Sequence, residues 1–464
     1  MNRRLFIFCI SIFIILGVIT YLIKLPNKNL FEAKWNNNNT LAITIDGEIS
    51  TTFPTTNAYE GTVTCTTGTG SVSWNGTKWV MTTSGITRGS TKCNVNFIFS
   101  PTWENPGSNT LLAKIKSNNN VVSTSTYPGQ QVSTSNEAIL SSKADDYGTS
   151  YYFRGNVTNN YVEYANMCWR IVRVTGNAGI KLVLYNYNGL SNTNTVRNSS
   201  TPCNVTGSNL SYMRLDNSLY FKFNEEGMDN AYEGLMYGSP NSSSYAASHA
   251  NVNVSTIVTS LNTWYKNVLL KQNNFKEDYL VDTIWCNDKN VITDTTYDPW
   301  DVGYNVNFGF GTNLNYYKTT QRLYNRVNNM VVSTPSFVCS NDNNGGKLSK
   351  FTVNDTKYGN GALRGYAKIG MLTADEIAFA GGAYGENNTN YYLYKNASAE
   401  FWWTISPSNY FGFARVWYAS KNGNLAYDGY VQSNNVAARP SITLSSKVKW
   451  SEGVGTASSP YRIF

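Results

Sequence analysis

The feature that most constrains this chain is a long apolar segment near its N-terminus. Residues 5–23 carry no charged side chain and directly follow Arg3 and Arg4. A helix of about 19 residues, rising roughly 1.5 Å per residue, can just cross a hydrocarbon core about 30 Å thick. Because cationic flanks stay on the cytoplasmic side, we expect residues 1–24 to form a cytoplasmic stub and a transmembrane signal anchor. The rest of the chain is then extracellular.

A cleaved secretory signal is the alternative interpretation of this segment. Such a signal has a shorter apolar core and small residues at its cleavage site, whereas Tyr21 to Pro26 present bulky side chains. Cys9 lies inside the apolar run without the small residues of a lipoprotein signal, so we interpret it as membrane-embedded. The sequence favours an uncleaved anchor, followed by a polar tether at residues 25–37.

The composition is poor in charge and rich in aromatic residues. Charged residues make up 14% of the 464 residues and aromatic residues another 14%, with 33 Tyr and 12 Trp. A chain of this length favours two or more domains, and its aromatic content suits packed cores rather than disorder. The net charge is +8, but no basic block is dense enough for nucleic-acid binding. We therefore expect no nucleic-acid partner.

Outside the apolar segment the chain has an even number of cysteines, which in an extracellular protein predicts disulfides. Six cysteines permit 15 pairings, and we expect the sequential one, in which each pair joins one local segment. Zinc is disfavoured because no Cys-x-x-Cys occurs and the chain has a single histidine. The disulfide candidates are Cys65, Cys93, Cys168, Cys203, Cys286 and Cys339.

The first extracellular segment has the alternating pattern of short β-strands. Between two Trp-containing runs, Asn75-Gly76 is typical of a type I′ hairpin turn. We predict a small immunoglobulin-like β-sandwich at residues 38–100, bridged by Cys65 and Cys93. A connector at residues 101–135, with a short helix at 111–116, follows it.

The remaining residues, 136–464, predict a larger domain that mixes strands with a few helices. Apolar residues recur at helical spacing from Ser255 to Lys271, with Ser255 as the N-cap. We interpret Trp264 and Tyr265 in this helix as core residues. The fold class we expect is α+β, mostly β: a membrane helix, the small sandwich and this larger domain.

Asp375 and Glu376 are the best paired carboxylates for acid and base chemistry, yet local structure explains them. Thr373 followed by Glu376 matches a capping box, and Asp375 in the first turn favours the positive end of the helix dipole. Gly381 then supplies the helix end. We therefore interpret both carboxylates as structural.

Other candidate sites are weaker still. The cluster Glu225, Glu226 and Asp229 does not follow the spacing of an EF-hand loop, and residues 342–346 begin such a loop but lack its bidentate glutamate. Calcium stays an alternative to solvated turns at both places. His249 beside Ser248 does not make a hydrolase triad, and nucleophile-elbow, phosphate-loop and dinucleotide motifs are absent. We expect no enzyme activity, cofactor or metal site.

The C-terminal third carries distinctive motifs, with Asn422-Gly423 as a hairpin turn between them. They are Trp-Trp-x-x-Ser-Pro at residues 402–407 and Arg-Pro-x-x-x-Leu at residues 439–444. Together with residues 261–265 and 372–376 they resemble an uncharacterised family of Gram-positive bacterial surface domains. The resemblance covers about residues 150–450.

That family is distantly similar to the C-type-lectin-like fold, which formylglycine-generating enzymes share. The chain lacks the catalytic cysteine pair of those enzymes and the Glu-Pro-Asn or Gln-Pro-Asp motif of calcium-dependent lectins. The resemblance therefore implies a fold but not sugar chemistry.

Aromatic residues surround the C-terminal hairpin and suggest a surface that stacks on a ligand, with cross-strand packing as the alternative. We expect an adhesin-like, non-catalytic surface protein, tethered to the membrane, that binds glycan or protein ligands. The alternatives are a cell-wall hydrolase that uses Asp375 or Glu226, and a structural component of a surface filament or layer. The candidate ligand-binding residues are Trp402, Trp403, Trp417, Tyr418, Tyr427, Tyr430 and Arg439.

Overall fold

The computed structural model describes residues 39–123, 138–189, 199–207, 209–216, 218–300, 309–327, 330–340, 342, 349–394 and 401–463. The expected anchor and tether lie outside these residues. Within the described ranges, every helix is too short or too polar to cross a bilayer. The structure is α+β and mostly β, as the sequence predicts. It divides after Gly107 into two compact units.

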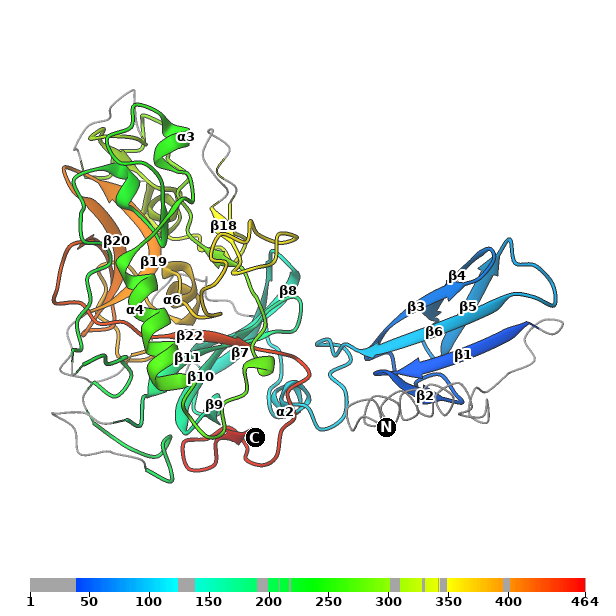
Figure 1. The fold of residues 1–464 in the computed structure, drawn as a ribbon. Helices are drawn as coiled ribbons and strands as arrows, with labels where there is room; N and C mark the ends of the chain where they lie inside the picture. Colours follow the sequence, from blue (N-terminus) through cyan, green and yellow to red (C-terminus); the bar gives the residue numbers. More distant parts are fainter. Residues whose placement is uncertain are drawn as a thin grey trace, which may run out of the picture. The chain divides into compact units, whose positions relative to one another are not determined.

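The first unit consists of short strands in two sheets (Figure 1). One sheet has the order β2-β1-β6-β3, with β1 parallel to β6, and the other is the β4–β5 hairpin. Buried side chains of β1 and β6 pack against Val72, Trp79 and Met81 of the hairpin, so the core lies between the sheets. The strands are β1 (Thr40–Ile45), β2 (Glu48–Ser50), β3 (Tyr59–Cys65), β4 (Thr69–Trp74), β5 (Trp79–Ser84) and β6 (Lys92–Phe99).

The predicted Asn-Gly hairpin forms, but with a longer turn than type I′ requires. Trp74 pairs with Trp79, so four residues connect the strands. The Asn75 side-chain oxygen accepts hydrogen bonds from the main-chain N–H groups of Thr77 and Lys78, at 3.1 and 2.9 Å. This Asx-type bonding replaces the two-residue loop.

The first disulfide differs from expectation in its position. Cys65 and Cys93 face each other on the neighbouring strands β3 and β6, with a Cα–Cα distance of 4.1 Å. The bond therefore joins two strands of one sheet and does not bridge the two sheets.

The second unit contains a sheet with the order β22-β11-β10-β8-β7 (Figure 1). All residues of β10 are buried, which is typical of a central strand covered on both faces. β9 extends the sheet by pairing with β10 and β23. The strands are β7 (Ala138–Asp145), β8 (Gly148–Gly155), β9 (Tyr161–Tyr164), β10 (Met167–Val174), β11 (Ile180–Asn186), β22 (Ser441–Leu444) and β23 (Tyr461–Arg462).

A further sheet of this unit has the order β15-β19-β20-β21 and contains the Trp-Trp-x-x-Ser-Pro motif in β19, whereas the Arg-Pro-x-x-x-Leu motif leads into β22 of the first sheet of this unit. The predicted turn at Asn422-Gly423 connects β20 and β21, with Gly423 at a φ of 81°. A Cβ atom at Gly423 would overlap the main-chain carbonyl of Asn388, so this turn requires glycine. The strands are β15 (Asn315–Tyr316), β19 (Phe401–Tyr410), β20 (Ala414–Ser420) and β21 (Leu425–Tyr430).

Short helices pack around these sheets. The helix predicted at residues 111–116 forms, but it belongs to the second unit, since Leu111, Leu112 and Ile115 are buried and the Leu111 N–H donates to Val448. The helix predicted from Ser255 also forms, and its Trp264 and Tyr265 are buried. The helices are α2 (Leu111–Asn118), α3 (Tyr245–Ser248), α4 (Thr256–Trp264) continuing as the π-helix η2 (Tyr265–Leu269), α5 (Lys318–Leu323), α6 (Ala374–Ala380), and the 3-10 turns η1 (Asn230–Tyr232) and η3 (Glu277–Tyr279).

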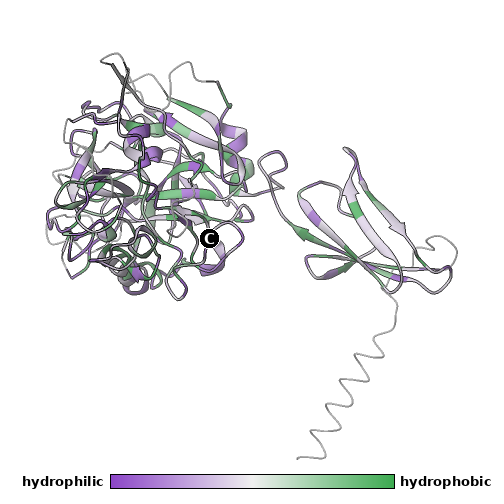
Figure 2. Cartoon of the chain, turned by 90° about the horizontal axis from the view of Figure 1, so that it is seen from above, coloured by the Kyte–Doolittle hydropathy of each residue, from purple (hydrophilic) through white to green (hydrophobic). Residues whose placement is uncertain are grey.

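Small two-stranded pairs and two disulfides complete the second unit. Cys168 is bonded to Cys203 and Cys286 to Cys339, so the sequential pairing is confirmed. The strand pairs are β12 (Met236–Tyr237) with β13 (Asn253–Val254), β14 (Trp285–Cys286) with β18 (Lys350–Phe351), and β16 (Asn325–Val327) with β17 (Met330–Val332). Figure 2 shows apolar and polar positions mixed along the strands of both units.

Candidate functional site

The carboxylates that the sequence singles out lie at the N-terminus of α6. The Thr373 hydroxyl accepts a hydrogen bond from the Glu376 N–H, and the Glu376 carboxylate accepts one from the Thr373 N–H, both at 3.0 Å. The predicted capping box is confirmed. Gly381 ends the helix at a φ of 127°. Asp375 and Glu376 therefore both lie in the first turn of α6, as the sequence predicts.

Glu376 is also the centre of a buried network of charges. Lys181 contacts both of its carboxylate oxygens, at 2.6 and 2.8 Å, and Arg173 contacts one at 3.0 Å. Arg173 in turn pairs with Asp145 at 2.6 Å. Burial raises the pKa of Glu376, but the charges of Lys181 and Arg173 outweigh burial and hold this pKa below its ordinary value. Glu376 is therefore ionised at neutral pH and unsuited to donate a proton.

Asp375 is held just as firmly. Arg322 contacts both of its carboxylate oxygens, at 2.9 and 3.0 Å, and also reaches Asp288 at 2.6 Å. The Ser336 N–H donates to Asp375 at 2.9 Å. Although burial lowers the pKa of Arg322, the charges of Asp375 and Asp288 raise it above its ordinary value. This bidentate pairing holds the Asp375 carboxylate in place.

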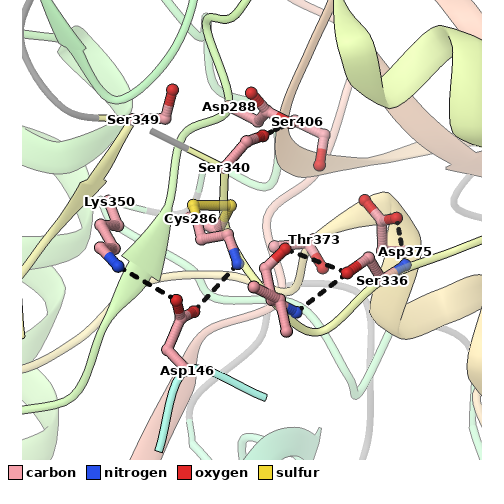
Figure 3. Close-up of a disulfide and its surroundings, with 12 residues drawn as sticks. Asp146, Cys286, Asp288, Ser336, Ser340, Ser349, Lys350, Thr373, Asp375 and Ser406 are labelled. Carbon is pink, nitrogen blue, oxygen red and sulfur yellow. Dashed lines mark hydrogen bonds and ion pairs between the residues drawn. A yellow bond between two sulfur atoms is a disulfide. The ribbon is translucent and has the colours of Figure 1, made fainter. Parts of the chain in front are cut away.

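A small polar cavity lies between this network and the disulfide Cys286–Cys339. Figure 3 shows the side chains around this disulfide. Beside the disulfide, Asp146 accepts hydrogen bonds from the Cys339 N–H at 2.9 Å and from Lys350 at 3.2 Å. The cavity measures about 20 Å³, which is room for about one water molecule. It is too small for a substrate.

The acidic residues considered for a cation have other partners. Asp229 accepts from the N–H groups of Ala231 and Asn241, and Glu225 pairs with Lys222 at the surface. Residues 343–346 of the second calcium candidate lie outside the described part. In the part of the chain that the structure describes, no three metal-ligating side chains are grouped to hold a metal ion.

His249 is not paired with Ser248 but with a distant carboxylate. Its ring nitrogen Nδ1 lies 2.8 Å from Asp342, and its ring stacks on Tyr245 at 3.8 Å between centroids. Burial lowers the pKa of His249, which the hydrogen bond to Asp342 opposes. The imidazole is buried and belongs to a polar cluster inside the second unit.

The three tryptophans expected to meet a ligand are buried. Trp403 is completely buried and its indole N–H donates to the Phe221 carbonyl at 2.7 Å. Trp417 donates to the Thr320 hydroxyl at 3.1 Å, and Trp402 is only 4% exposed. Neighbouring segments cover both faces of β19, so neither Trp402 nor Trp403 is left for solvent. Cross-strand and core packing therefore account for all three tryptophans.

Arg439 is likewise internal. Its guanidinium lies 4.8 Å from the ring centre of Trp402 and donates to the main-chain carbonyls of Leu184 and Leu393. These contacts explain a buried arginine without a carboxylate, since carbonyl dipoles and the indole ring replace its hydration.

The three candidate tyrosines lie at the surface of the sheet β15-β19-β20-β21, on its strands β20 and β21. Tyr418 and Tyr427 are half-buried, and Tyr430 is 42% exposed. The Tyr418 hydroxyl donates to Asp428 at 2.9 Å. Arg415 lies over the ring of Tyr430 at 4.9 Å. These side chains keep polar groups at the solvent boundary.

Tyr427 belongs to a group of stacked rings, which we name the aromatic cluster: Trp300, Tyr324, Tyr384 and Tyr427. Trp300 stacks on Tyr427 at 3.9 Å and on Tyr324 at 5.2 Å between centroids. Tyr384 lies 4.3 Å from Tyr324 and 5.6 Å from Tyr427. Trp300, Tyr384 and Tyr427 are half-buried, so the cluster reaches solvent. Sequence reasoning missed three members because they come from separate loops and helix ends without periodicity.

Comparisons of this chain with protein-family models, with curated proteins and with solved structures found no match.

Proposed function

We propose that this chain is a membrane-tethered extracellular protein whose second unit binds a glycan or protein ligand without catalysis. The half-buried aromatic cluster is the observation that carries the proposal. Three disulfides support an oxidising, extracellular location. The apolar segment at residues 5–23 supports the tether.

The proposal also includes a fold for each unit: an immunoglobulin-like sandwich for the first and a C-type-lectin-like fold for the second. The first unit has two facing sheets and a first strand parallel to the last, which supports an immunoglobulin-like sandwich. Its disulfide within one sheet departs from the inter-sheet bridge of antibody domains. For the second unit, the Trp-Trp-x-x-Ser-Pro and Arg-Pro strands support the C-type-lectin-like assignment.

The aromatic cluster has the chemistry that a glycan ligand requires. Tyrosine and tryptophan present large apolar surfaces with a polar edge, and the C–H faces of a sugar ring pack against such surfaces. Asp428, which follows Tyr427 in β21 and accepts a hydrogen bond from Tyr418, is exposed and can also accept hydrogen bonds from sugar hydroxyls. Arg415, which lies over the ring of Tyr430, provides a donor on the neighbouring strand β20. Stacking with a few polar contacts thus gives affinity without a reaction.

A hydrolase that uses Asp375 is disfavoured by the ion pairs described above. A general acid needs a carboxyl group with a raised pKa, whereas the pKa of neighbouring Glu376 is lowered. Glu226 is exposed at the surface and does not line the small cavity described above. Replacing Asp375 with Asn should leave peptidoglycan turnover unchanged.

A binding experiment on the full chain in detergent tests the proposal. We expect a glycan array, or a pull-down of surface proteins, to identify a ligand for the folded wild type. Tyr427→Ala should weaken its affinity about tenfold, or about 1.4 kcal/mol. Tyr220→Ala is the matched control, because Tyr220 is an exposed tyrosine outside the aromatic cluster. Equal losses in both variants, or no ligand in either assay, would contradict the proposal.

A further inference from the structure

A lysine inside the second unit is surrounded by carbonyl groups. Lys289 is 2% exposed, and its amine nitrogen Nζ lies 2.8 Å from the His249 carbonyl and 3.2 Å from the Met236 carbonyl. The third group within reach is the side-chain carboxamide of Asn251, whose oxygen lies 3.1 Å from Nζ. Short segments next to β14 and β13 thus bring an amine and a carboxamide together.

The surroundings favour the uncharged, nucleophilic amine. All three acceptors are neutral, and a buried ammonium is costly unless it is paired. Burial accordingly lowers the pKa of Lys289 to about 7, although the charge of Asp342 opposes this effect. A desolvated lysine of this kind is a nucleophile toward carbonyl carbon.

A buried carboxyl group is linked to the lysine through His249. Asp342 is 4% exposed, accepts a hydrogen bond from the Tyr245 hydroxyl at 2.9 Å and lies 2.8 Å from the His249 ring. Its charge acts on Lys289. Carboxylate and imidazole side chains are of the kind that carry protons in such reactions.

We propose that Lys289 and Asn251 become joined by an intramolecular amide bond. The nitrogen Nζ of Lys289 attacks the carbon Cγ of Asn251, so that the Nζ–Cγ bond forms and the Cγ–Nδ2 bond breaks. One proton passes from Nζ to Nδ2, and ammonia leaves. No oxidant or cofactor takes part. Of the three carbonyl groups, only that of Asn251 can react in this way without cutting the main chain.

The cross-link has a structural purpose that a disulfide does not supply. It closes a loop from Asn251 to Lys289, which contains β13 and β14, and lowers the conformational entropy of the unfolded chain, as any loop closure does. An amide bond also persists in a reducing environment, where Cys286–Cys339 would open. The inference is independent of the ligand proposed above.

Peptide mapping of the full chain tests the bond directly. After reduction and alkylation, trypsin should release residues 223–266 joined to residues 277–318, because an acylated Lys289 is no longer a cleavage site. We expect this branched peptide to be lighter than its two parts by one ammonia, with fragment ions that place the junction at Asn251 and Lys289. Linear peptides 223–266 and 277–289 as the sole products would overturn the proposal.

Variants separate the reaction from ordinary packing. Lys289→Arg keeps a cation but should yield linear peptides, and Asn251→Ala should do the same. Asp342→Asn should lower the cross-linked fraction at least tenfold if this carboxyl carries the proton. Lys276→Arg, which alters an exposed lysine, should leave the cross-link intact. If a variant fails to fold, the wild-type map alone decides the question.

Discussion

Individual residues in this protein show how burial and charge compete. Glu376 and Glu233 are both inaccessible to solvent, yet their pKa values shift in opposite directions. Glu376 has two cationic partners within 3.0 Å, whereas Glu233 accepts a long hydrogen bond from the Arg415 N–H at 3.4 Å and a hydrogen bond from the Tyr317 hydroxyl. The partner, rather than burial, decides which form of the carboxyl group is stable.

Glu376→Gln should strongly destabilise the second unit. The substitution leaves Lys181 and Arg173 buried without their shared anion, and breaking such a pair costs about 3–5 kcal/mol. Denaturant unfolding measures this loss. Glu225→Gln, which breaks the exposed pair with Lys222, is the control and should cost no more than about 1 kcal/mol. Similar losses of stability for the two variants would show that the buried ion pairs of Glu376 do not stabilise the second unit.

Glu233 should make stability fall as pH rises. Burial raises the folded-state pKa of Glu233 well above the ordinary 4.5, and the hydrogen bond and charge of Arg415 only partly oppose this. Above pH 4.5 the unfolded chain loses this proton while the folded chain keeps it, so stability declines with pH. Glu233→Gln removes this decline. Thermal unfolding at pH 5 and pH 8 should show that the variant gains stability relative to wild type only at the higher pH.

At the scale of elements, short-range sequence determines where helices and turns begin and end. The capping box at Thr373 and the turn at Gly423 form because their bonds involve neighbouring residues. The helix from Ser255 forms where apolar spacing predicts it, but Ser255 makes no side-chain capping bond. The position of a helix is thus predictable even where its cap is not.

Thr373→Ala should cost about 1 kcal/mol, because it removes the hydroxyl that satisfies a helix N–H. Ser255→Ala provides the matched control, since its hydroxyl makes no such bond. The free energy of unfolding of both variants, measured side by side, checks the difference. Equal effects would show that the capping bond in α6 contributes nothing measurable.

At the scale of the whole molecule, the chain divides into two units with separate cores and separate disulfides. Each unit holds its own hydrophobic material, so each is expected to unfold as its own cooperative transition. The disulfides pair residues 28, 35 and 53 positions apart, and none joins one unit to the other. Each bond therefore stabilises only the unit that contains it.

Replacing both Cys65 and Cys93 with Ala should lower the free energy of unfolding of the first unit by about 2–4 kcal/mol, so its transition should move to lower temperature. The transition of the second unit should stay in place. Differential scanning calorimetry of the full chain in detergent resolves the two events. Replacing Cys286 and Cys339 is the reciprocal experiment, and a shift of both transitions in either variant would argue against independent units.

The sequence by itself determined the features that depend on neighbours along the chain: the strand-rich first unit, the helix from Ser255 and the capping box. It permitted 15 disulfide pairings, and the structure selected the sequential one. Only the tertiary structure decided which aromatic residues reach solvent. Trp402 and Trp403 alternate along β19, but segments from both sides cover them, whereas Trp300 and Tyr384 meet Tyr427 from distant loops. Periodicity reports which face of a strand a residue occupies. Whether that face is buried depends on contacts between residues far apart in sequence.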